Sequence, residues 1–379
     1  MIPYGRQDIA QEDIDSVIEV LNSDFLTQGP VVPKFEDELC NLTGAKYSIA
    51  SNSATSSLHL ACLSLGLGTG DILWTSPITF VASVNCALHC NANVDFIDVD
   101  PNTGLISIEK LKEKLKQAEI KGSLPKIIIP VHFAGQPCNM EEIFFLGKKY
   151  GFKIIEDAAH AIGAKYRGGY VGNCLYSDIT VFSFHPVKII TSGEGGASLT
   201  NNSILASKMR LLRSHGITRD KREMQNPSDA SWYYEQIDLG YNFRMTDIHA
   251  ALGLSQIKRL DEYVERRIEL VNLYKDKLSY NGFSSLEQKD NRRSSWHLFI
   301  IRIDGEKKLR DDLITVLREN EVAVNLHYIP VYKHPYFNQK ICLKGAEDYY
   351  DSALTVPLFP KMTINDVEHV STIINNYFN

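Results

Sequence analysis

The sequence lacks the features of a membrane-spanning or exported chain. It has no apolar run of the ~20 residues that a helix needs to cross a bilayer. Its first residues, MIPYGRQDIAQED, do not show the basic and then apolar pattern of a signal peptide. The seven cysteines are an odd number and lie scattered, mostly among apolar residues, which favours reduced core thiols over a disulfide framework. We therefore expect a cytoplasmic protein with no membrane partner.

An excess of basic charge is also absent. Lysine and arginine number 40 against 46 acidic residues, so the formal net charge is −6. Nucleic acids and anionic membranes require a concentrated basic surface, and the most basic stretches, near Arg219 and Arg266, are interleaved with acids. Cys86 and Cys90 flank His89, but no second ligand pair follows at a zinc-like spacing. We expect neither a nucleic-acid partner nor a metal site.

The chain does contain a regular alternation of short apolar runs and amphipathic segments. The runs predict strands at 47–50, 72–76, 93–100, 126–133, 153–157 and 178–184, and the segments between them predict helices at 51–67, 79–90, 107–118 and 140–151. Such alternation is typical of an α/β fold with a mainly parallel sheet covered on both faces. Sheets of this kind bind ligands at the carboxyl ends of their strands.

The flanking segments complete the expected organisation. Two helices, at 11–22 and 34–44, precede the alternation; a polar stretch at 216–232 is expected to be an inserted loop, and a long helical region follows at 241–278. The remainder predicts an α+β domain with strands at 294–304 and 322–330 and helices at 308–320 and 364–378. With 379 residues, the chain is long enough for a large domain at 1–250 and a smaller one at 251–379.

Polar residues follow three of the predicted strands where a phosphorylated ring would need them. The serines and Thr55 of SNSATSS stand at a strand-to-helix turn, where free N–H groups can bind a phosphate, although serines also cap helices there. Asp157 follows a buried strand and could pair with a protonated pyridine nitrogen, or cap a helix. His160 could contact such a ring or be structural, and Ser183 could bind the phosphate or a local carbonyl.

Lys188, in VFSFHPVKIITSGEGG, is the candidate nucleophile. Its neighbours are apolar, and desolvation lowers the pKa of an amine, which favours Schiff-base chemistry. A lysine at the edge of the core is the alternative. The order of a phosphate seat, an acid and then a lysine 31 residues later is what pyridoxal phosphate requires. A nicotinamide cofactor would instead require G-x-G-x-x-G in the first strand–helix turn, which here is SNSAT.

These residues lie in blocks that resemble the sugar-nucleotide aminotransferases of the DegT/StrS type. The blocks cover nearly the whole chain and include SNSATSSLHLA, SPITFVASVNC, IIEDAAHAIGAKY, FSFHPVKIITSGEGG and LGYNFRMTDIHAALG. The resemblance implies the pyridoxal-phosphate-dependent transferase fold of type I, with a mainly parallel seven-stranded sheet between helices and a smaller α+β C-terminal domain. In this family a histidine in place of the lysine marks sugar dehydratases, so Lys188 favours amino transfer.

The resemblance also implies a role for each matching residue. Lys188 would bond the cofactor and move the substrate proton, while Asp157 would pair with the pyridinium nitrogen. The phosphate would be held by Ala54 through its N–H, by Thr55 and by Ser183. The two faces of the ring would be covered by Phe80 and His160, the latter a glutamine in many relatives. Asn242 would reach the phosphate of the neighbouring subunit, which makes a homodimer necessary.

The opening MIPYGRQDI and SDFLTQGP narrow the resemblance to members that act in pseudaminic acid biosynthesis. It implies L-glutamate as donor, 2-oxoglutarate as its product, and a UDP-linked 4-keto-6-deoxy-N-acetylhexosamine aminated at position 4. Substrate contacts are expected from Tyr4, Arg6, His327 and Tyr328. The alternatives are an aminotransferase or dehydratase acting on another nucleotide ketosugar, and a non-enzymatic regulator that binds the cofactor or a sugar nucleotide.

Overall fold

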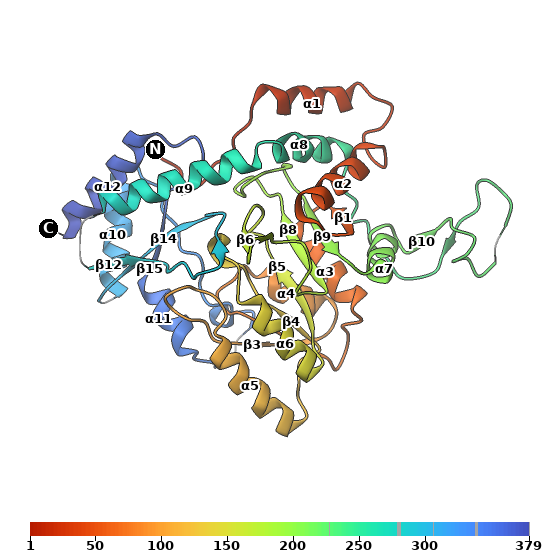
Figure 1. Ribbon diagram of the computed structural model, residues 1–379, viewed down its shortest axis with the longest axis horizontal. Helices are drawn as coiled ribbons and strands as arrows, with labels where there is room; N and C mark the ends of the chain where they lie inside the picture. Colours follow the sequence, from red (N-terminus) through yellow and green to blue (C-terminus); the bar gives the residue numbers. More distant parts are fainter. Residues whose placement is uncertain (227, 279–281, 306, 338–339, 379) are drawn as a thin grey trace.

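A seven-stranded sheet forms the centre of the computed structural model, which describes residues 1–226, 228–278, 282–305, 307–337 and 340–378 (Figure 1). In spatial order the strands are β1 (Tyr47–Ser51), β9 (Gly196–Thr200), β8 (Ile179–Ser183), β5 (Lys153–Asp157), β4 (Ile127–Ile129), β2 (Ile72–Thr75) and β3 (Asn93–Phe96). The pairs from β3 to β8 are parallel, and β9 runs antiparallel to both of its neighbours. The prediction of a mainly parallel seven-stranded sheet is confirmed.

Helices cover both faces of this sheet, as the continuous apolar strands require. Ile127 and Ile129 of β4 pack in one core cluster with residues of the first group of helices, whereas Ile128, between them, packs on the opposite face. The first group comprises α3 (Ala54–Ser64), α4 (Ala82–His89) and α7 (Ser203–Arg213). The second comprises α2 (Val31–Thr43), α5 (Ile108–Lys121), α6 (Met140–Tyr150) and α8 (Asp247–Ile257).

The last third of the chain builds a smaller antiparallel sheet with its own core. Its strands, in spatial order, are β12 (Phe283–Ser285), β14 (Phe299–Ile303) and β15 (Ala353–Val356). The neighbouring helices are α9 (Leu260–Lys277), α10 (Lys307–Glu319), α11 (Lys344–Ser352) and α12 (Ile364–Phe378). The predicted domain boundary at residue 250 lies inside α8, and the division into two domains remains a prediction.

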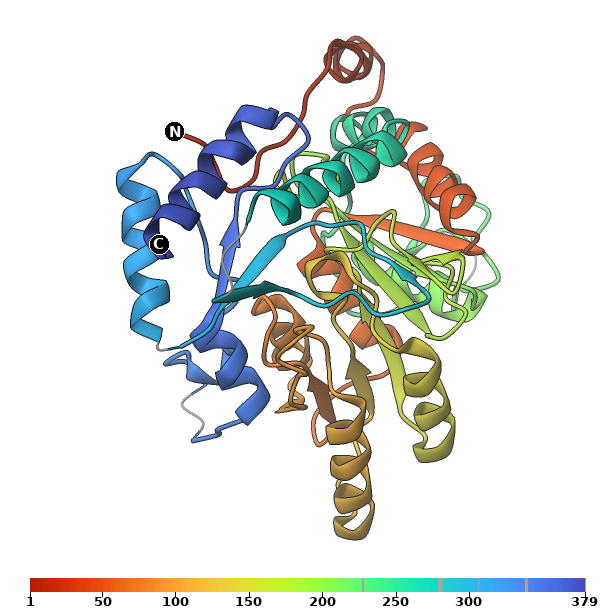
Figure 2. The ribbon, with the colours of Figure 1, turned by 60° about the vertical axis from the view of Figure 1, so that its left-hand side comes forward.

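The N-terminal residues pack against this smaller sheet before the chain enters α1 (Gln11–Leu21). Ile2 forms a β-bridge with Val322, and the carbonyl of Tyr4 accepts the N–H of Leu358 at 3.1 Å. Figure 1 shows the N-terminus beside α12, while α1 lies above α8 at the top of the view. Figure 2 shows α5 extending from the body of the molecule, away from α1.

The polar stretch predicted as a loop is part of a projecting arm. The pairing of β10 (Ile217–Thr218) with β11 (Glu235–Gln236) forms its base, and the arm extends away from α7 in Figure 1. Short pairings also join three two-residue strands: β6 (Lys165–Tyr166), β7 (Gly169–Tyr170) and β13 (Arg292–Arg293). Two 3-10 turns complete the described elements: η1 (Phe133–Gly135) and η2 (Val331–Lys333).

Two expectations for the second half of the chain are corrected. The helical region expected at 241–278 is two helices, and the first begins only at Asp247, where the Thr246 hydroxyl accepts the N–H of His249 at 3.2 Å. The strand expected at 322–330 is wrong: within it, Asn325 alone forms a bridge to the small sheet, with Thr355. Val322 and Val324 are buried in the adjoining core, so their alternation reflects packing without a strand ladder.

Candidate active site

The period of two along β5 places Asp157 on the same face of the sheet as α3 and α4. Ile155 belongs to the core on that face, and Asp157, two residues further, is buried with 5% of its surface exposed. Its Oδ2 accepts a hydrogen bond from the Ser83 hydroxyl on α4 at 2.5 Å, and its Oδ1 accepts the N–H of Ala159 at 3.1 Å. The carboxylate is therefore held in a fixed direction at the end of the strand.

The first turn of α3 lies beside the start of β9. The Ser53 hydroxyl caps the helix by accepting the N–H of Ser56 at 3.1 Å. The N–H groups of Ala54 and Thr55 donate to no acceptor among the described residues. A Cβ on Gly196 would lie 2.5 Å from the nitrogen of Ala54, so only glycine allows the strand to approach this turn so closely. The sequence therefore builds a turn with two free donors.

Lys188 lies in the turn that connects β8 to β9. The buried side chains of Ile189 and Ile190 anchor this turn, and Gly193 (φ 80°) reverses the chain before β9. The residue is half-buried, but its amine is desolvated, which lowers the pKa of Lys188 to about 8; attraction to Asp157 opposes that shift. The carboxylate of Asp157 therefore favours the charged form of the amine.

Three predicted residues, His160, His327 and Tyr328, form a buried cluster near this lysine. Nδ1 of His160 accepts the N–H of Ala134 at 3.3 Å, and its Nε2 lies 3.2 Å from the hydroxyl of Tyr328. Burial and the nearby Lys188 lower the pKa of His160 well below its ordinary range, so the ring is neutral. Burial and Lys188 also lower the pKa of His327, to about 3, and its Nδ1 lies 2.9 Å from the hydroxyl of Thr355.

Other predicted residues border this cluster or lie on the surface. The ring of Tyr4 is 5.6 Å from that of His327, and the ring of Phe80 is 6.3 Å from that of Tyr328. Phe80 is 59% exposed. Ser183, at the end of β8, is buried, and its hydroxyl accepts the N–H of His185 at 3.5 Å.

Thr55, Arg6 and Asn242 are exposed. The carbonyl of Asn242 accepts a hydrogen bond from the Asn52 side chain at 3.4 Å, which places its backbone beside the start of α3 of the same chain.

Sequence reasoning did not identify two side chains at the site. Ser83 was overlooked because a helical serine inside an apolar segment is ordinary; its position one helical turn after Thr79, just past β2, was the available signal. His297 lies inside the segment predicted as a strand at 294–304, and nothing in its spacing relates it to His160. In the structure the two imidazole rings are 4.4 Å apart.

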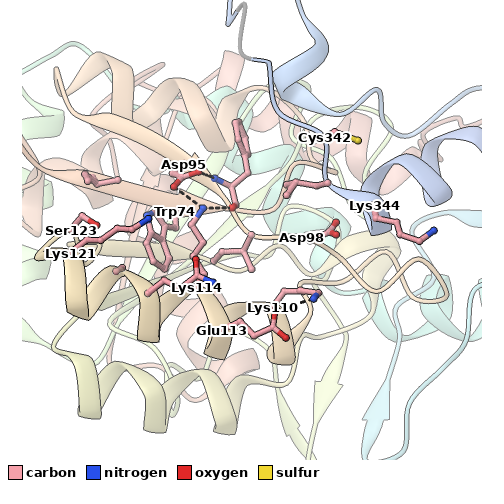
Figure 3. Close-up of a pocket in the computed structure, with 16 residues that line it drawn as sticks. Trp74, Asp95, Asp98, Lys110, Glu113, Lys114, Lys121, Ser123, Cys342 and Lys344 are labelled. Atoms are coloured by element: carbon pink, nitrogen blue, oxygen red, sulfur yellow. Dashed lines mark hydrogen bonds and ion pairs between the residues drawn. The ribbon is translucent and has the colours of Figure 1, made fainter.

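A surface cleft of about 600 Å³ lies elsewhere, between α5 and the segment before α11 (Figure 3). Two of its lysines have carboxylate partners: Lys114 pairs with Asp95 at 2.6 Å, and Lys110 pairs with Glu113 at 2.9 Å. Trp74 below them is 2% exposed. The cleft therefore offers no open face of this aromatic ring. Among the described residues no cluster of His, Cys, Asp or Glu side chains is arranged to hold a metal ion, and no helix is long and apolar enough to cross a membrane.

The gathered groups suit one kind of ligand. Free N–H groups at a helix start donate hydrogen bonds to a phosphate, and a fixed buried carboxylate accepts one from a ring N–H⁺. An amine with a lowered pKa forms a bond with an aldehyde. Pyridoxal phosphate carries all three complementary groups. The fold and the site together define an α/β enzyme of the pyridoxal-phosphate-dependent transferase type.

The comparisons with known proteins lead to the family. The model of the DegT/DnrJ/EryC1/StrS aminotransferase family matches residues 7–375, and the chain belongs to this family. It is 39% identical over 376 residues to the UDP-4-amino-4,6-dideoxy-N-acetyl-beta-L-altrosamine transaminase of Campylobacter jejuni strain 81-176, covering 98% of this chain and 96% of that protein. Like its relatives, it is a pyridoxal-phosphate-dependent sugar aminotransferase.

Solved structures agree with this assignment. Helicobacter pylori PseC, described as an aminotransferase involved in the biosynthesis of pseudoaminic acid, superposes with a TM-score of 0.91 at 30% identity, covering 100% of this chain and 99% of PseC. The putative sugar aminotransferase Spr1654 of Streptococcus pneumoniae, in its PLP form, has a TM-score of 0.89 at 28% identity, covering 99% of this chain and 98% of that one. The fold is therefore that of fold-type-I sugar aminotransferases, as predicted.

Proposed function

We propose that this enzyme transfers the amino group of L-glutamate to position 4 of a UDP-linked 4-keto-6-deoxy-N-acetylhexosamine, as a step of pseudaminic acid biosynthesis. The observation that carries the proposal is the 39% identity, over nearly the whole chain, to a transaminase whose name specifies a UDP-4-amino-4,6-dideoxy sugar. The likeness to PseC along 100% of the chain supports the same pathway. We also propose a cytoplasmic location, which the seven free cysteines support.

When bound, pyridoxal phosphate supplies an aldehyde that bonds amines and a ring that withdraws electrons from the carbon next to the bonded nitrogen. In our proposal Lys188 holds the cofactor and, once released by the donor amine, carries the proton removed from the α-carbon. Its pKa of about 8 suits a group that must gain and lose a proton near neutral pH. Asp157, fixed by Ser83, keeps a proton on the ring nitrogen.

The remaining residues are proposed to bind and orient. The N–H groups of Ala54 and Thr55, with the hydroxyls of Thr55 and Ser183, hold the phosphate, since α3 leaves these donors free. Phe80 and His160 border the two faces of the ring, and Asn242 of a neighbouring subunit completes the phosphate site in a homodimer.

Tyr4, Arg6, His327 and Tyr328 are proposed to contact the sugar nucleotide. The rings of Tyr4, His327 and Tyr328 lie together, which supports a shared binding wall.

A substrate panel tests this proposal. Purified enzyme is given glutamate with UDP- and dTDP-linked sugars that carry a ketone at position 3 or 4, and 2-oxoglutarate is measured while NMR locates the new amine. We expect turnover with the UDP-linked 4-keto-6-deoxy-N-acetylhexosamine and an amine at position 4. Turnover confined to another ketosugar would overturn the substrate assignment. Loss of water from the sugar without glutamate consumption would instead indicate the dehydratase alternative, and absence of any half-reaction would indicate the regulator.

A further inference from the structure

Two chain segments cross directly behind His160. The first contains Ala134 and Gly135 of η1, and the second runs from Ser295 to Leu298. The N–H of Ser295 donates to the carbonyl of Gly135 at 3.1 Å, and the N–H of Leu298 donates to the carbonyl of Ala134 at 3.4 Å. A Cβ on Gly135 would lie 2.8 Å from the nitrogen of Trp296, so the crossing requires glycine there. The two segments therefore touch backbone to backbone.

The crossing contains two residues in a costly conformation. Ala134 (φ 55°) and Trp296 (φ 49°) both have left-handed backbones, which favour glycine. Each such residue costs of order 1 kcal/mol or more and persists where its surroundings over-determine it, frequently at functional sites. Here the strained Ala134 presents its N–H to Nδ1 of His160 at 3.3 Å. Because Nδ1 accepts, the neutral imidazole carries its proton on Nε2, facing the Tyr328 hydroxyl.

Two buried polar side chains pack at the same crossing, and each has a nitrogen without a hydrogen-bond partner among the described residues. His297 is 3% exposed, its ring lies 4.4 Å from that of His160, and its Nδ1 has no hydrogen-bond partner among the described residues. Arg267 of α9 is 1% exposed and has no carboxylate partner in the described chain. Its Nη1 donates to the carbonyls of Trp296 at 3.3 Å, His297 at 3.2 Å and Leu358 at 2.9 Å.

Packing alone does not explain these two residues. An apolar side chain in place of His297 would avoid burying an unpaired nitrogen, and an uncharged residue in place of Arg267 would avoid burying an isolated cation. Both costs, and the strain at Ala134 and Trp296, arise at the crossing that contacts and orients a single ring, that of His160. Burial and the positive Lys188 also act to keep His297 uncharged, since they lower its pKa well below the ordinary range.

We propose that His297, held through its carbonyl by Arg267, is a positioning residue that keeps the His160 ring in its Nε2–H tautomer and in one orientation at the cofactor. The proposal rests on the proposed contact of His160 with the cofactor ring. It assigns His297 no contact with substrate or cofactor. The effect of His297 on the reaction must therefore depend on His160, and this dependence can be measured.

A double-mutant cycle tests the dependence. His297→Phe keeps a ring but removes its nitrogens, and His297→Gln is the second variant should the larger ring disturb folding. We expect either change to lower kcat about tenfold, the size of a coupling between residues in contact, with KM for glutamate within about twofold. In a His160→Gln background the same change is expected to alter kcat less than about twofold. Equal losses in both backgrounds would overturn the proposal, as would no loss in the wild-type background.

A second measurement does not require cofactor or turnover. ¹⁵N NMR of the imidazole nitrogens in cofactor-free protein reports which nitrogen of His160 carries the proton. We expect a single Nε2–H tautomer in the wild type and a mixture in His297→Phe and Arg267→Lys. Tyr274→Phe is the matched control, because it removes another buried and unpartnered polar atom, on the same helix as Arg267. Unchanged His160 signals would overturn the proposal, and so would a changed tautomer without a change in kcat. If glutamate turnover is absent in the wild type, the proposed function fails while this measurement still stands.

Discussion

At the scale of single residues, two adjacent acids on β5 have different roles because they point to opposite faces of the sheet. Glu156 is buried beside His132, whose Nε2 lies 2.6 Å from its Oε2, and it accepts hydrogen bonds from Ser177 at 2.5 Å and Thr180 at 2.8 Å. All these partners are structural. Asp157 instead faces α4 and has Ser83 as its side-chain donor. The alternation of the strand therefore separates a structural acid from the one available to a ligand.

The hydrogen bond from Ser83 gives the first prediction. Ser83→Ala removes the donor that fixes Asp157 and is expected to lower kcat about tenfold, in line with the loss of a hydrogen bond to a charged group. Asp157→Asn is expected to retain the cofactor and to reduce proton abstraction far more. Stopped-flow measurement of the glutamate half-reaction checks both. Ser64→Ala is the control, since Ser64 is also a buried helical serine but bonds only the carbonyl of Ala61. A wild-type rate in Asp157→Asn would count against the assigned role.

The lowered pKa of Lys188 gives a prediction on pH. A protonated amine does not attack an aldehyde, so the reactive fraction increases as the pH passes upward through about 8 rather than through the ordinary 10.5. The rate at which cofactor-free protein takes up pyridoxal phosphate is expected to rise about tenfold between pH 7 and pH 9. The absorbance of the bound cofactor measures this rate of uptake. Lys188→Ala should abolish both that absorbance and turnover, whereas the exposed Lys116→Ala should leave them unchanged. A midpoint near 10.5 would contradict the burial argument.

At the scale of elements, the contact between β9 and α3 fixes the position of the turn that we propose binds the phosphate. Gly196→Ala would place a Cβ 2.5 Å from the nitrogen of Ala54, so the first turn of α3 must shift. We expect affinity for pyridoxal phosphate to fall about tenfold or more, because the free N–H donors move with the turn. Gly68→Ala is the matched control, since nothing lies within 4 Å of its Cβ position. Titration of the two cofactor-free variants with pyridoxal phosphate measures both affinities. Equal affinities would show that the turn is not part of the phosphate site.

Element types were predictable wherever local sequence pattern and tertiary environment agreed. The strands ending at Ser51, Asp157 and Ser183 and the helix starting after Ser53 follow from apolar runs and a capping serine, and they carry most of the site. The stretch 322–330 alternates like a strand but forms two isolated bridges, Val322 with Ile2 and Asn325 with Thr355, and no ladder among the described residues. Contacts such as His160 with His297 join segments 137 positions apart, and no local pattern specifies them.

At the scale of the whole molecule, the proposed homodimer has a direct test. Asn242 is exposed, and its backbone lies beside α3 of its own chain, so its side chain could serve its own site or a neighbour's. We predict that chains carrying Lys188→Ala and chains carrying Asn242→Ala, each inactive alone, regain activity when refolded together. A random mixture should reach about a quarter of wild-type activity, because half of the dimers are mixed and each contains one intact site. Absence of recovery, with mixed dimers present, would show that Asn242 acts within its own subunit.

The path of the N-terminal residues has a mechanical consequence. The bridge between Ile2 and Val322 ties the start of the chain to the smaller sheet, while α9 connects that sheet to the larger part a second time. The backbone hydrogen bonds from Ser295 to Gly135 and from Leu298 to Ala134 form a third attachment, and a body held at three separate points cannot swing as a hinge. Tyr4, carried on the first of these attachments, is therefore kept beside His327.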